Sequence, residues 1–95
     1  MSRTELVEIV LSDIETAAEL HERLKGCLAF PAFYGQNWDA FWDAITGLVE
    51  MPTTLRLVGW KNLTAKLPQE ASHMKACLDE MAIKYPEWAS QVVYA

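Results

Sequence analysis

Short apolar runs and helically spaced apolar positions alternate along the chain. The run from Leu6 to Leu11 is rich in Val, Ile and Leu and is broken only by Glu8, which predicts a short, largely buried strand. Two later runs, 55–60 and 92–94, have the same character, and Gly59 weakens the end of the first. The pattern therefore predicts three strands separated by segments of a different periodicity.

Helix-boundary residues frame two of those segments. Ser12 to Glu15 has the form of a capping box, in which each side chain bonds to the other residue's backbone N–H. A first helix is therefore predicted to follow, to about Leu28. Another long helix is predicted from Pro68, with apolar side chains along one side, until Pro86 interrupts it.

The segment between these helices has the most regular helical pattern in the sequence. After a loop over 29–36, Asn37 is a favoured N-cap residue, whose side chain can accept from a free N–H of the next turn. Met51-Pro52 ends the predicted helix. Its apolar face consists of Trp38, Phe41, Trp42, Ile45, Leu48 and Val49.

The order of these elements is strand, helices, strand, helices, strand. Such an α/β order favours parallel strands joined through helices that cover the sheet. Residues 61–66 are predicted as a short connection, and Trp88, in the loop after Pro86, is predicted to tuck over the sheet edge rather than to lie exposed. No repeat or linker divides the chain, so we expect a single α/β domain over residues 1–95.

Composition excludes several classes of function. The net charge is −5, and the eight Lys and Arg residues never gather into a run that could follow a phosphate backbone, so direct binding of nucleic acid is disfavoured. No segment approaches the roughly 18 continuous apolar residues of a membrane span, and a cytoplasmic protein is expected. Cys27 and Cys77 are predicted to be reduced and mostly packed thiols.

Negative charge is concentrated on one predicted helix. Residues 26–55 contain no Lys or Arg and three carboxylates, those of Asp39, Asp43 and Glu50. On a helical projection these acids lie at about 100° to 140° from Trp38, well away from the apolar arc. Like charges at i, i+4 repel, and Gly47 in the same sector weakens a helix. These local costs favour an outward acidic face that serves a partner, although a merely solvated face is the alternative.

The loop before this helix carries two aromatic residues. Phe33 and Tyr34 precede Gly35, and exposed aromatic side chains are typical anchors of protein interfaces. Either ring can instead fold back into the core, and burial is expected less for Tyr34, which carries a hydroxyl, than for Phe33. We therefore expect Tyr34 to be available to a partner.

Catalysis and metal binding are poorly supported. Asp39 and Asp43, one turn apart on a convex helix face, lack the facing cleft that acid/base chemistry needs. His21 is expected to be packed or satisfied at the surface, and His73 to face solvent; neither has ligand spacing to another His, Cys or Asp. We expect a protein that is not an enzyme and that uses neither a metal nor a cofactor.

Three stretches of the chain match one known pattern: Phe33-Tyr34-Gly35-Gln36-Asn37-Trp38-Asp39-Ala40-Phe41-Trp42-Asp43, then Leu20-His21 with Leu24, Leu28 and Pro31 before it, and Thr46-Gly47, Val49-Glu50 and Pro52 after it. In these residues the chain resembles the barstar family of intracellular ribonuclease inhibitors. It is specific over about a third of the chain. It implies a small α/β fold with three parallel strands and helices packed on the sheet.

The resemblance also implies an interface. Asp43 would occupy the phosphate position of a ribonuclease active site, and Asp39 would bond at its base-recognition side. Glu80 matches an acidic residue at the edge of the same contact. The remaining residues implied in the contact are Tyr34, Gly35, Asn37, Trp38, Ala40, Trp42, Thr46 and Gly47, with Glu50 on the same acidic face.

The implied partner is a small basic ribonuclease of the extracellular type, or a related toxin, bound by a monomer in a 1:1 complex without contact to nucleic acid or membrane. This chain departs from the family at Leu48, where a Trp is usual, and at Phe33 and Trp38, which replace Tyr and Leu. These changes leave the acidic residues intact and alter their surroundings. The alternative is a barstar-like acidic module that regulates a different cationic protein or toxin.

Overall fold

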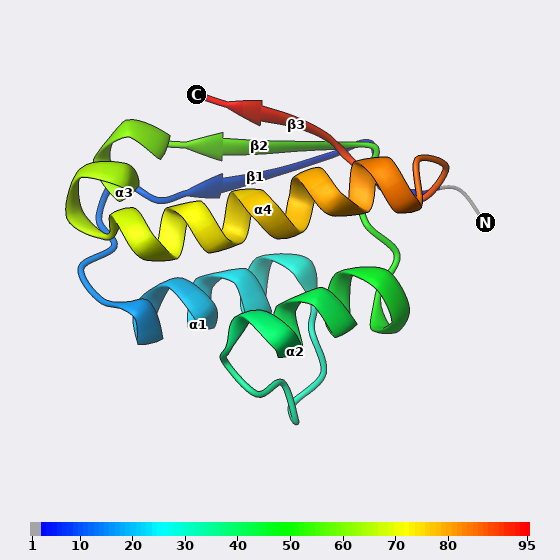
Figure 1. The fold of residues 1–95 in the computed structure, drawn as a ribbon, viewed down its shortest axis with the longest axis horizontal. Helices are drawn as coiled ribbons and strands as arrows, with labels where there is room; N and C mark the ends of the chain where they lie inside the picture. Colours follow the sequence, from blue (N-terminus) through cyan, green and yellow to red (C-terminus); the bar gives the residue numbers. More distant parts are fainter. Residues whose placement is uncertain (1–2) are drawn as a thin grey trace.

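Three parallel strands form the centre of the protein. The computed structural model describes residues 3–95, with strands β1 (Leu6–Val10), β2 (Thr54–Val58) and β3 (Gln91–Tyr94) in the order β1-β2-β3 (Figure 1). The register pairs Ile9 with Leu57 and Leu57 with Tyr94. The three predicted strands and their parallel arrangement are therefore confirmed.

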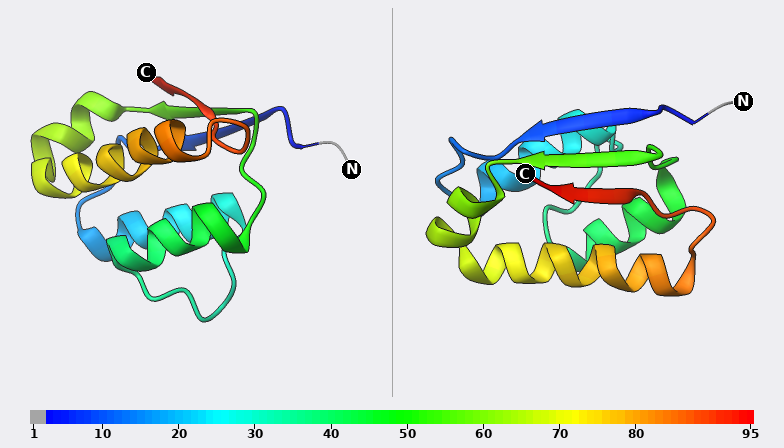
Figure 2. Two further views of the ribbon diagram at one scale, coloured as in Figure 1. Left: turned by 45° about the vertical axis from the view of Figure 1, so that its right-hand side comes forward. Right: turned by 90° about the horizontal axis from the view of Figure 1, so that it is seen from above.

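The helices lie on one face of this sheet. They are α1 (Ala17–Leu28), α2 (Trp38–Asp43), α3 (Trp60–Lys66) and α4 (Pro68–Lys84), and a π-helical segment (Ala44–Leu48) continues α2. Figures 1 and 2 show α1, α2 and α4 beneath the sheet and α3 at its end. The predicted α/β class is thus confirmed as a sheet layer covered by a helical layer. In the described residues, no helix is long and apolar enough to cross a membrane.

The core fills the space between the two layers. It combines the inward side chains of β1 and β2, Ile9, Leu55 and Leu57, with apolar residues from every long helix. Burial of apolar area at roughly 25 cal/mol per Å² is the dominant favourable contribution to such a fold. The helical core residues are Leu20, Leu24 and Leu28 in α1, Phe41 in α2, Ala44 and Ile45 in the π-helical segment, Leu63 in α3, and Ala71, Met74, Leu78 and Met81 in α4.

The opposite face of the sheet is open, which corrects one prediction. β1 was expected to be largely buried, but Leu6 and Val10 are exposed and only Ile9 is fully enclosed within the strand. Successive side chains of a strand point to opposite faces, so helices on one side alone bury alternate residues. On the open face the exposed Glu8 carboxylate pairs with Arg56 Nε at 3.1 Å.

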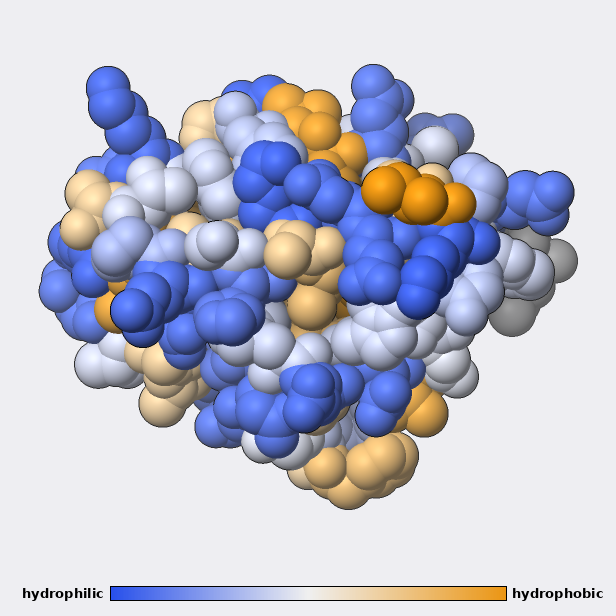
Figure 3. Space-filling model, in the orientation of Figure 1, coloured by the Kyte–Doolittle hydropathy of each residue, from blue (hydrophilic) through white to orange (hydrophobic). Residues whose placement is uncertain are grey.

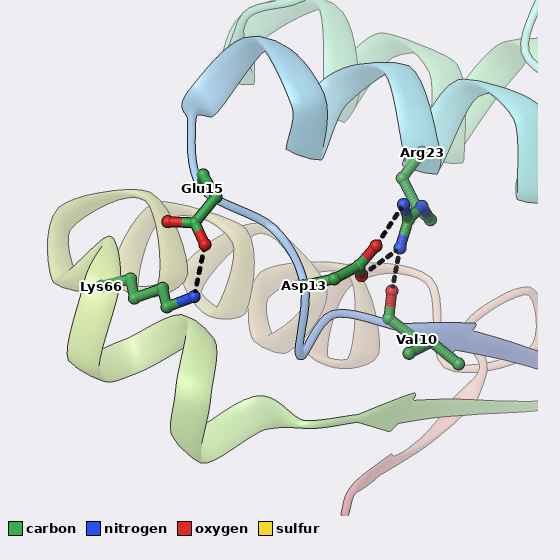
Figure 4. A network of polar contacts seen from close by, with 5 residues as sticks. All are labelled: Val10, Asp13, Glu15, Arg23 and Lys66. Carbon is green, nitrogen blue, oxygen red and sulfur yellow. Dashed lines mark hydrogen bonds and ion pairs between the residues drawn. The ribbon is translucent and has the colours of Figure 1, made fainter.

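Helix α1 begins later than the Ser12 capping box predicted. Thr16 is the N-cap, and its hydroxyl accepts from the Glu19 backbone N–H at 3.1 Å, so the cap lies one turn further on. Glu15 lies before the helix, and its carboxylate pairs with Lys66 Nζ of α3 at 2.8 Å (Figure 4). This exposed pair joins the segment before α1 to α3 and adds little stability.

Arg23 joins helix α1 to the end of β1. Its guanidinium donates to both carboxylate oxygens of Asp13, at 2.7 and 3.0 Å, and to the Val10 carbonyl at 2.7 Å (Figure 4). The hydrogen bond from Arg23 lowers the pKa of Asp13 below its ordinary value. Both groups are substantially exposed, so this contact contributes orientation more than stability.

Two further sequence predictions were wrong in this half of the molecule. Residues 61–66, predicted as a connection, belong to helix α3, and Trp60, predicted in the second strand, opens that helix and packs on the Tyr94 ring with centroids 4.6 Å apart. Gly59 separates the two elements with φ of 82°, and a Cβ there would lie 2.7 Å from Ser12 N.

The prediction that both cysteines are mostly packed was wrong for one of them. Cys27 is exposed, whereas Cys77 is half-buried, and both are free thiols.

Arg3 fastens the loop between α4 and β3 to the turn before β2. Its guanidinium donates to the carbonyls of Met51 and Pro52, at 2.9 and 2.8 Å, and to those of residues 87, 88 and 89 at 3.1 to 3.3 Å. The Ser90 hydroxyl donates to the same Pro52 carbonyl at 2.6 Å. One planar, multi-donor group thus joins three segments that are distant in sequence.

We expect Arg3→Lys to lower the free energy of unfolding by about 2 kcal/mol, because a lysine ammonium cannot span carbonyls on both sides and charge-assisted hydrogen bonds are lost. For a domain of this size the unfolding temperature should fall by roughly 10 °C. The matched control is Arg56→Lys, which disturbs only an exposed ion pair and should change stability by less than about 0.5 kcal/mol. Equal urea midpoints for the two variants would contradict this role of Arg3.

Candidate functional site

The predicted N-cap residue fixes the start of α2. Asn37 has an extended backbone, and its side-chain oxygen accepts from the Ala40 N–H at 2.7 Å, while its side-chain amide donates to the Gly35 carbonyl at 3.2 Å. This cap satisfies one of the free N–H groups of the first turn and holds the end of the loop against the helix. The prediction that the helix begins after Asn37 is confirmed.

A cluster of aromatic side chains anchors both the loop and the helix. Nδ1 of His21 in α1 lies 2.7 Å from the Tyr34 hydroxyl oxygen. The centroid of the His21 ring is 4.4 Å from that of the Trp38 ring. Phe30 packs against Tyr34 and Phe41 with centroids 4.8 and 6.0 Å apart. The loop is therefore tied to α1 on one side and to α2 on the other.

The prediction for one of the two loop aromatics was wrong. Tyr34, expected to be available to a partner, is only 7% exposed, whereas Phe33, the more plausible candidate for burial, is 75% exposed. The buried hydrogen bond to His21 gives the Tyr34 hydroxyl a partner inside the fold, so the whole Tyr34 ring can be buried without leaving a polar group unpaired. Burial also raises the pKa of Tyr34, so the hydroxyl keeps its proton.

His21 is packed, in agreement with one of its two predicted environments. It is the one buried polar residue among those described, and desolvation lowers its pKa below the ordinary 6.5, opposed by the charge of Glu70. The Glu70 carboxylate accepts from the Trp38 indole N–H at 3.3 Å. A neutral imidazole is therefore built into the aromatic cluster that positions α2.

Asp39 and Asp43 project from α2 into solvent. Both are exposed, and neither belongs to the ion-paired carboxylates of residues 3–95. The expected outward acidic face is therefore present for these two residues. Asp39 also lies in the first turn of α2, where the N-terminal end of the helix dipole favours an anion.

The surface around these aspartates is hollowed rather than convex. Asp39, Asp43, Trp38 and Trp42 from α2 face His73, Ala76, Cys77, Glu80 and Lys84 from α4 across an open depression of about 500 Å³. Sequence reasoning missed this because the second wall comes from a helix that follows 30 residues later. His73 is exposed, as expected, and borders the same depression. We call it the acidic hollow.

One lysine lies at the edge of the acidic hollow. Lys84 Nζ is 3.0 Å from Glu80 Oε1 and 5.9 Å from the centre of the Trp42 ring. This contact raises the pKa of Lys84, chiefly through the hydrogen bond that its ammonium donates to Glu80. Deeper in the wall, burial raises the pKa of the Cys77 thiol, with the charges of Glu80 and Asp39 acting in the same direction. With three carboxylates and one ammonium group in its lining, the hollow carries a net negative charge.

The end of the acidic helix differs from the prediction. The π-helical segment 44–48 has a wider turn than an α-helix, so residues beyond Ile45 leave the projected positions. Leu48, expected on the apolar face, is 48% exposed, and Glu50 lies beyond the helix. The Thr46 hydroxyl donates to the Trp42 carbonyl at 2.6 Å. Only Asp39 and Asp43 therefore share one helical face.

The described residues contain no group of three or more His, Cys, Asp and Glu side chains that could hold a metal ion. The acidic hollow is lined by the carboxylates of Asp39, Asp43 and Glu80 and by the ammonium group of Lys84. Two tryptophan rings lie beside these groups. Such a surface is suited to cationic side chains, through charge-assisted hydrogen bonds and contact with aromatic faces. Much of the molecular face seen in Figure 3 is hydrophilic, and its apolar patches are small and separate.

Comparison with known proteins identifies the family. The profile of the family described as Barstar (barnase inhibitor) matches residues 4–94, so the chain belongs to the barstar family, whose members are inhibitors and not enzymes. A protein of Bacillus subtilis (strain 168) named "Putative ribonuclease inhibitor YrdF" is 51% identical over 45 residues, which are 47% of this chain. The matched segment spans half the length of that relative.

The stability of the aromatic cluster should depend on pH. Because the pKa of His21 is lowered in the folded state, only the unfolded chain gains a proton as the pH falls below about 6.5, so the free energy of unfolding decreases. The limiting slope for one proton is about 1.4 kcal/mol per pH unit. Urea midpoints between pH 7.5 and 5 should show this decline in the parent chain and in exposed His73→Gln, and a flatter profile in His21→Gln. Parallel profiles for His21→Gln and the parent would contradict it.

Proposed function

We propose that this protein inhibits a small basic ribonuclease of the extracellular type by placing the carboxylates of Asp39 and Asp43 in its cationic active site. The observation that carries the proposal is that both carboxylates are exposed, are not ion-paired within residues 3–95, and are fixed on one helix beside the acidic hollow. The family and the name of the relative support the same class of partner.

Preorganisation explains how two carboxylates can bind strongly. The Asn37 cap and the aromatic cluster hold α2 before the partner arrives, so little conformational entropy is lost on binding. Asp43 would meet the groups that bind the substrate phosphate, and Asp39 those on the base-recognition side. RNA is then excluded because its anionic backbone and the inhibitor carboxylates compete for the same cations.

The proposed contact surface keeps most of the residues that the sequence suggested. Gly35, Asn37, Gly47, Glu50 and Glu80 are exposed, and Trp38, Ala40, Trp42 and Thr46 are partly exposed. A Cβ on Gly47 would meet nothing within 4 Å, so packing inside this chain does not require glycine there, which supports close approach by a partner. Tyr34 is assigned a positioning role, because its buried ring holds the loop.

The proposal extends to the setting of the complex. One copy of the chain would bind one nuclease in the cytoplasm and protect the producing cell, as an immunity protein neutralises a toxin. The uncompensated carboxylates would also speed encounter with a basic partner, and added salt would slow it, because charge interactions are screened beyond about 10 Å at 0.1 M ionic strength.

We expect Asp43→Ala to weaken binding to a basic ribonuclease by at least about 2 kcal/mol, a factor of about 30, because a charge is left without its partner in the complex. Barnase is the first probe, assayed by inhibition of RNA cleavage and by titration calorimetry. Thermal stability should change little, because Asp43 is exposed. The control is Asp79→Ala, which breaks only an exposed pair with Lys75 on α4.

Affinity capture from the source organism tests the natural partner. The parent chain and the Asp39→Ala/Asp43→Ala double variant are used side by side, and a small basic ribonuclease retained only by the parent is the expected result. A basic protein without ribonuclease activity would favour the alternative of a barstar-like module for another cationic partner. Equal retention of the ribonuclease by both chains would show that these carboxylates do not carry the binding.

Removing the lysine at the edge of the acidic hollow should speed association. Lys84→Gln deletes a positive charge beside Glu80 and Trp42, so the association rate constant with a basic ribonuclease should rise roughly two- to threefold in low salt and converge with the parent above about 0.5 M salt. Stopped-flow fluorescence measures both limits. A slower association in low salt would instead mean that Lys84 contributes an attractive contact.

A further inference from the structure

An exposed tryptophan lies on a well-fixed loop next to the proposed contact surface. Trp88 is 62% exposed, contrary to the prediction that it tucks over the sheet edge. Its loop is fixed from both sides: the N–H groups of residues 88 and 89 donate to the Tyr85 carbonyl, each at 3.0 Å, and Arg3 Nη2 donates to the Trp88 carbonyl at 3.1 Å. An exposed large aromatic held in place has the properties of an interface anchor.

The surroundings of Trp88 are continuous with the acidic hollow. One adjacent depression of about 210 Å³ shares Lys84 with the acidic hollow and is bounded by Tyr85, Glu87 and Trp88. Tyr85 also lies beside Trp42, with ring centroids 6.3 Å apart. A partner that covers Asp43 and Trp42 therefore meets Trp88 along the same surface.

A second depression that borders Trp88 combines an aromatic side chain with negative charge. It has a volume of about 270 Å³ and is bounded by Thr46, Leu48, Glu50 and Trp88. Glu50, which borders this depression, and Glu87, which borders the first, are exposed and are not among the ion-paired carboxylates of residues 3–95. We call the surface formed by Leu48, Glu50 and Trp88 the indole subsite.

We propose that the indole subsite binds an arginine side chain of the same basic partner, with the guanidinium stacked on Trp88 and bonded to Glu50. This inference rests on the proposed function for the partner's identity, and it adds a second cation contact outside the acidic hollow. Charge complementarity selects this occupant: an arginine is planar, stacks on indole and carries donors in a fork that fits a carboxylate. A purely apolar side chain would leave the Glu50 carboxylate at its border without a partner.

Small-molecule titration tests the occupant directly. In 15N-labelled protein, N-acetyl-argininamide is expected to shift the Trp88 indole and Glu50 amide resonances with saturation, and at least fivefold more tightly than N-acetyl-leucinamide at equal ionic strength. The response at Glu50 should fall at least threefold in Trp88→Leu. It should persist in Asp43→Asn, which disables only the acidic hollow. Equal responses to the two compounds, or no saturable response, would overturn the proposal.

Dissociation from barnase tests the contribution of the subsite to a complex. We expect Trp88→Leu to raise the dissociation rate constant roughly fivefold, Trp88→Phe to raise it less, and Glu50→Gln to reduce the dependence of affinity on salt. The control is Ile83→Ala, an exposed apolar residue of α4 that borders none of these depressions.

The same series separates the two proposals. If Asp43→Ala dissociates faster but Trp88→Leu and Glu50→Gln match the parent, the indole subsite is refuted and the proposed function stands. If Asp43→Ala matches the parent, or the parent does not bind barnase, the result counts against the proposed function and against the subsite that rests on it. Self-association that is abolished in Trp88→Leu, seen by sedimentation, would assign the surface to a second copy and overturn the proposal.

Discussion

The direction of the acidic helix depends on one buried polar contact between His21 and Tyr34. This contact, 2.7 Å long, ties the loop before α2 to α1, and the Trp38 ring packs on the same imidazole. With Phe41 buried on the inner side, α2 can rotate little, and Asp39 must point outward. The cluster tolerates only small adjustments, because interiors are closely packed and a buried polar pair is costly to break. Interface geometry and core packing are thus the same constraint.

Local signals in the sequence were sufficient for most of the fold. Val, Ile and Leu runs located the three strands, and Asn37 and Pro68 marked helix starts correctly because caps act within four residues. Prediction failed where the local signal could be read in two ways: Ser12 and Thr16 each precede a Glu by three residues, and the structure uses Thr16 as the N-cap. Glu15 instead pairs with Lys66, 51 residues away, a contact that a single sequence does not reveal.

The candidate site was predictable in charge and not in shape. The spacing of Asp39 and Asp43 placed both on one side of a helix, as the structure shows. The opposing wall from α4 and the widened π-turn before Leu48 depend on how two helices pack, which helical periodicity does not encode. The burial of Tyr34 has the same origin, because the partner of its hydroxyl, His21, comes from another helix. The charge of the candidate site could thus be predicted from the sequence, whereas the packing that decides which side chains are exposed could not.

In the described part of the chain, the carboxylates of Asp39 and Asp43 stay unpaired although the fold contains several cations. Within residues 3–95, Arg3 binds carbonyl oxygens, and Arg23, Arg56, Lys66, Lys75 and Lys84 bind carboxylates, so six of the eight Lys and Arg residues have such partners. Of these six, only Lys84 borders the acidic hollow, where it pairs with Glu80. Exposed pairs of this kind add little stability. None of the six contacts involves Asp39 or Asp43, so α2 presents these two carboxylates without an ion-pair partner in residues 3–95 and already oriented.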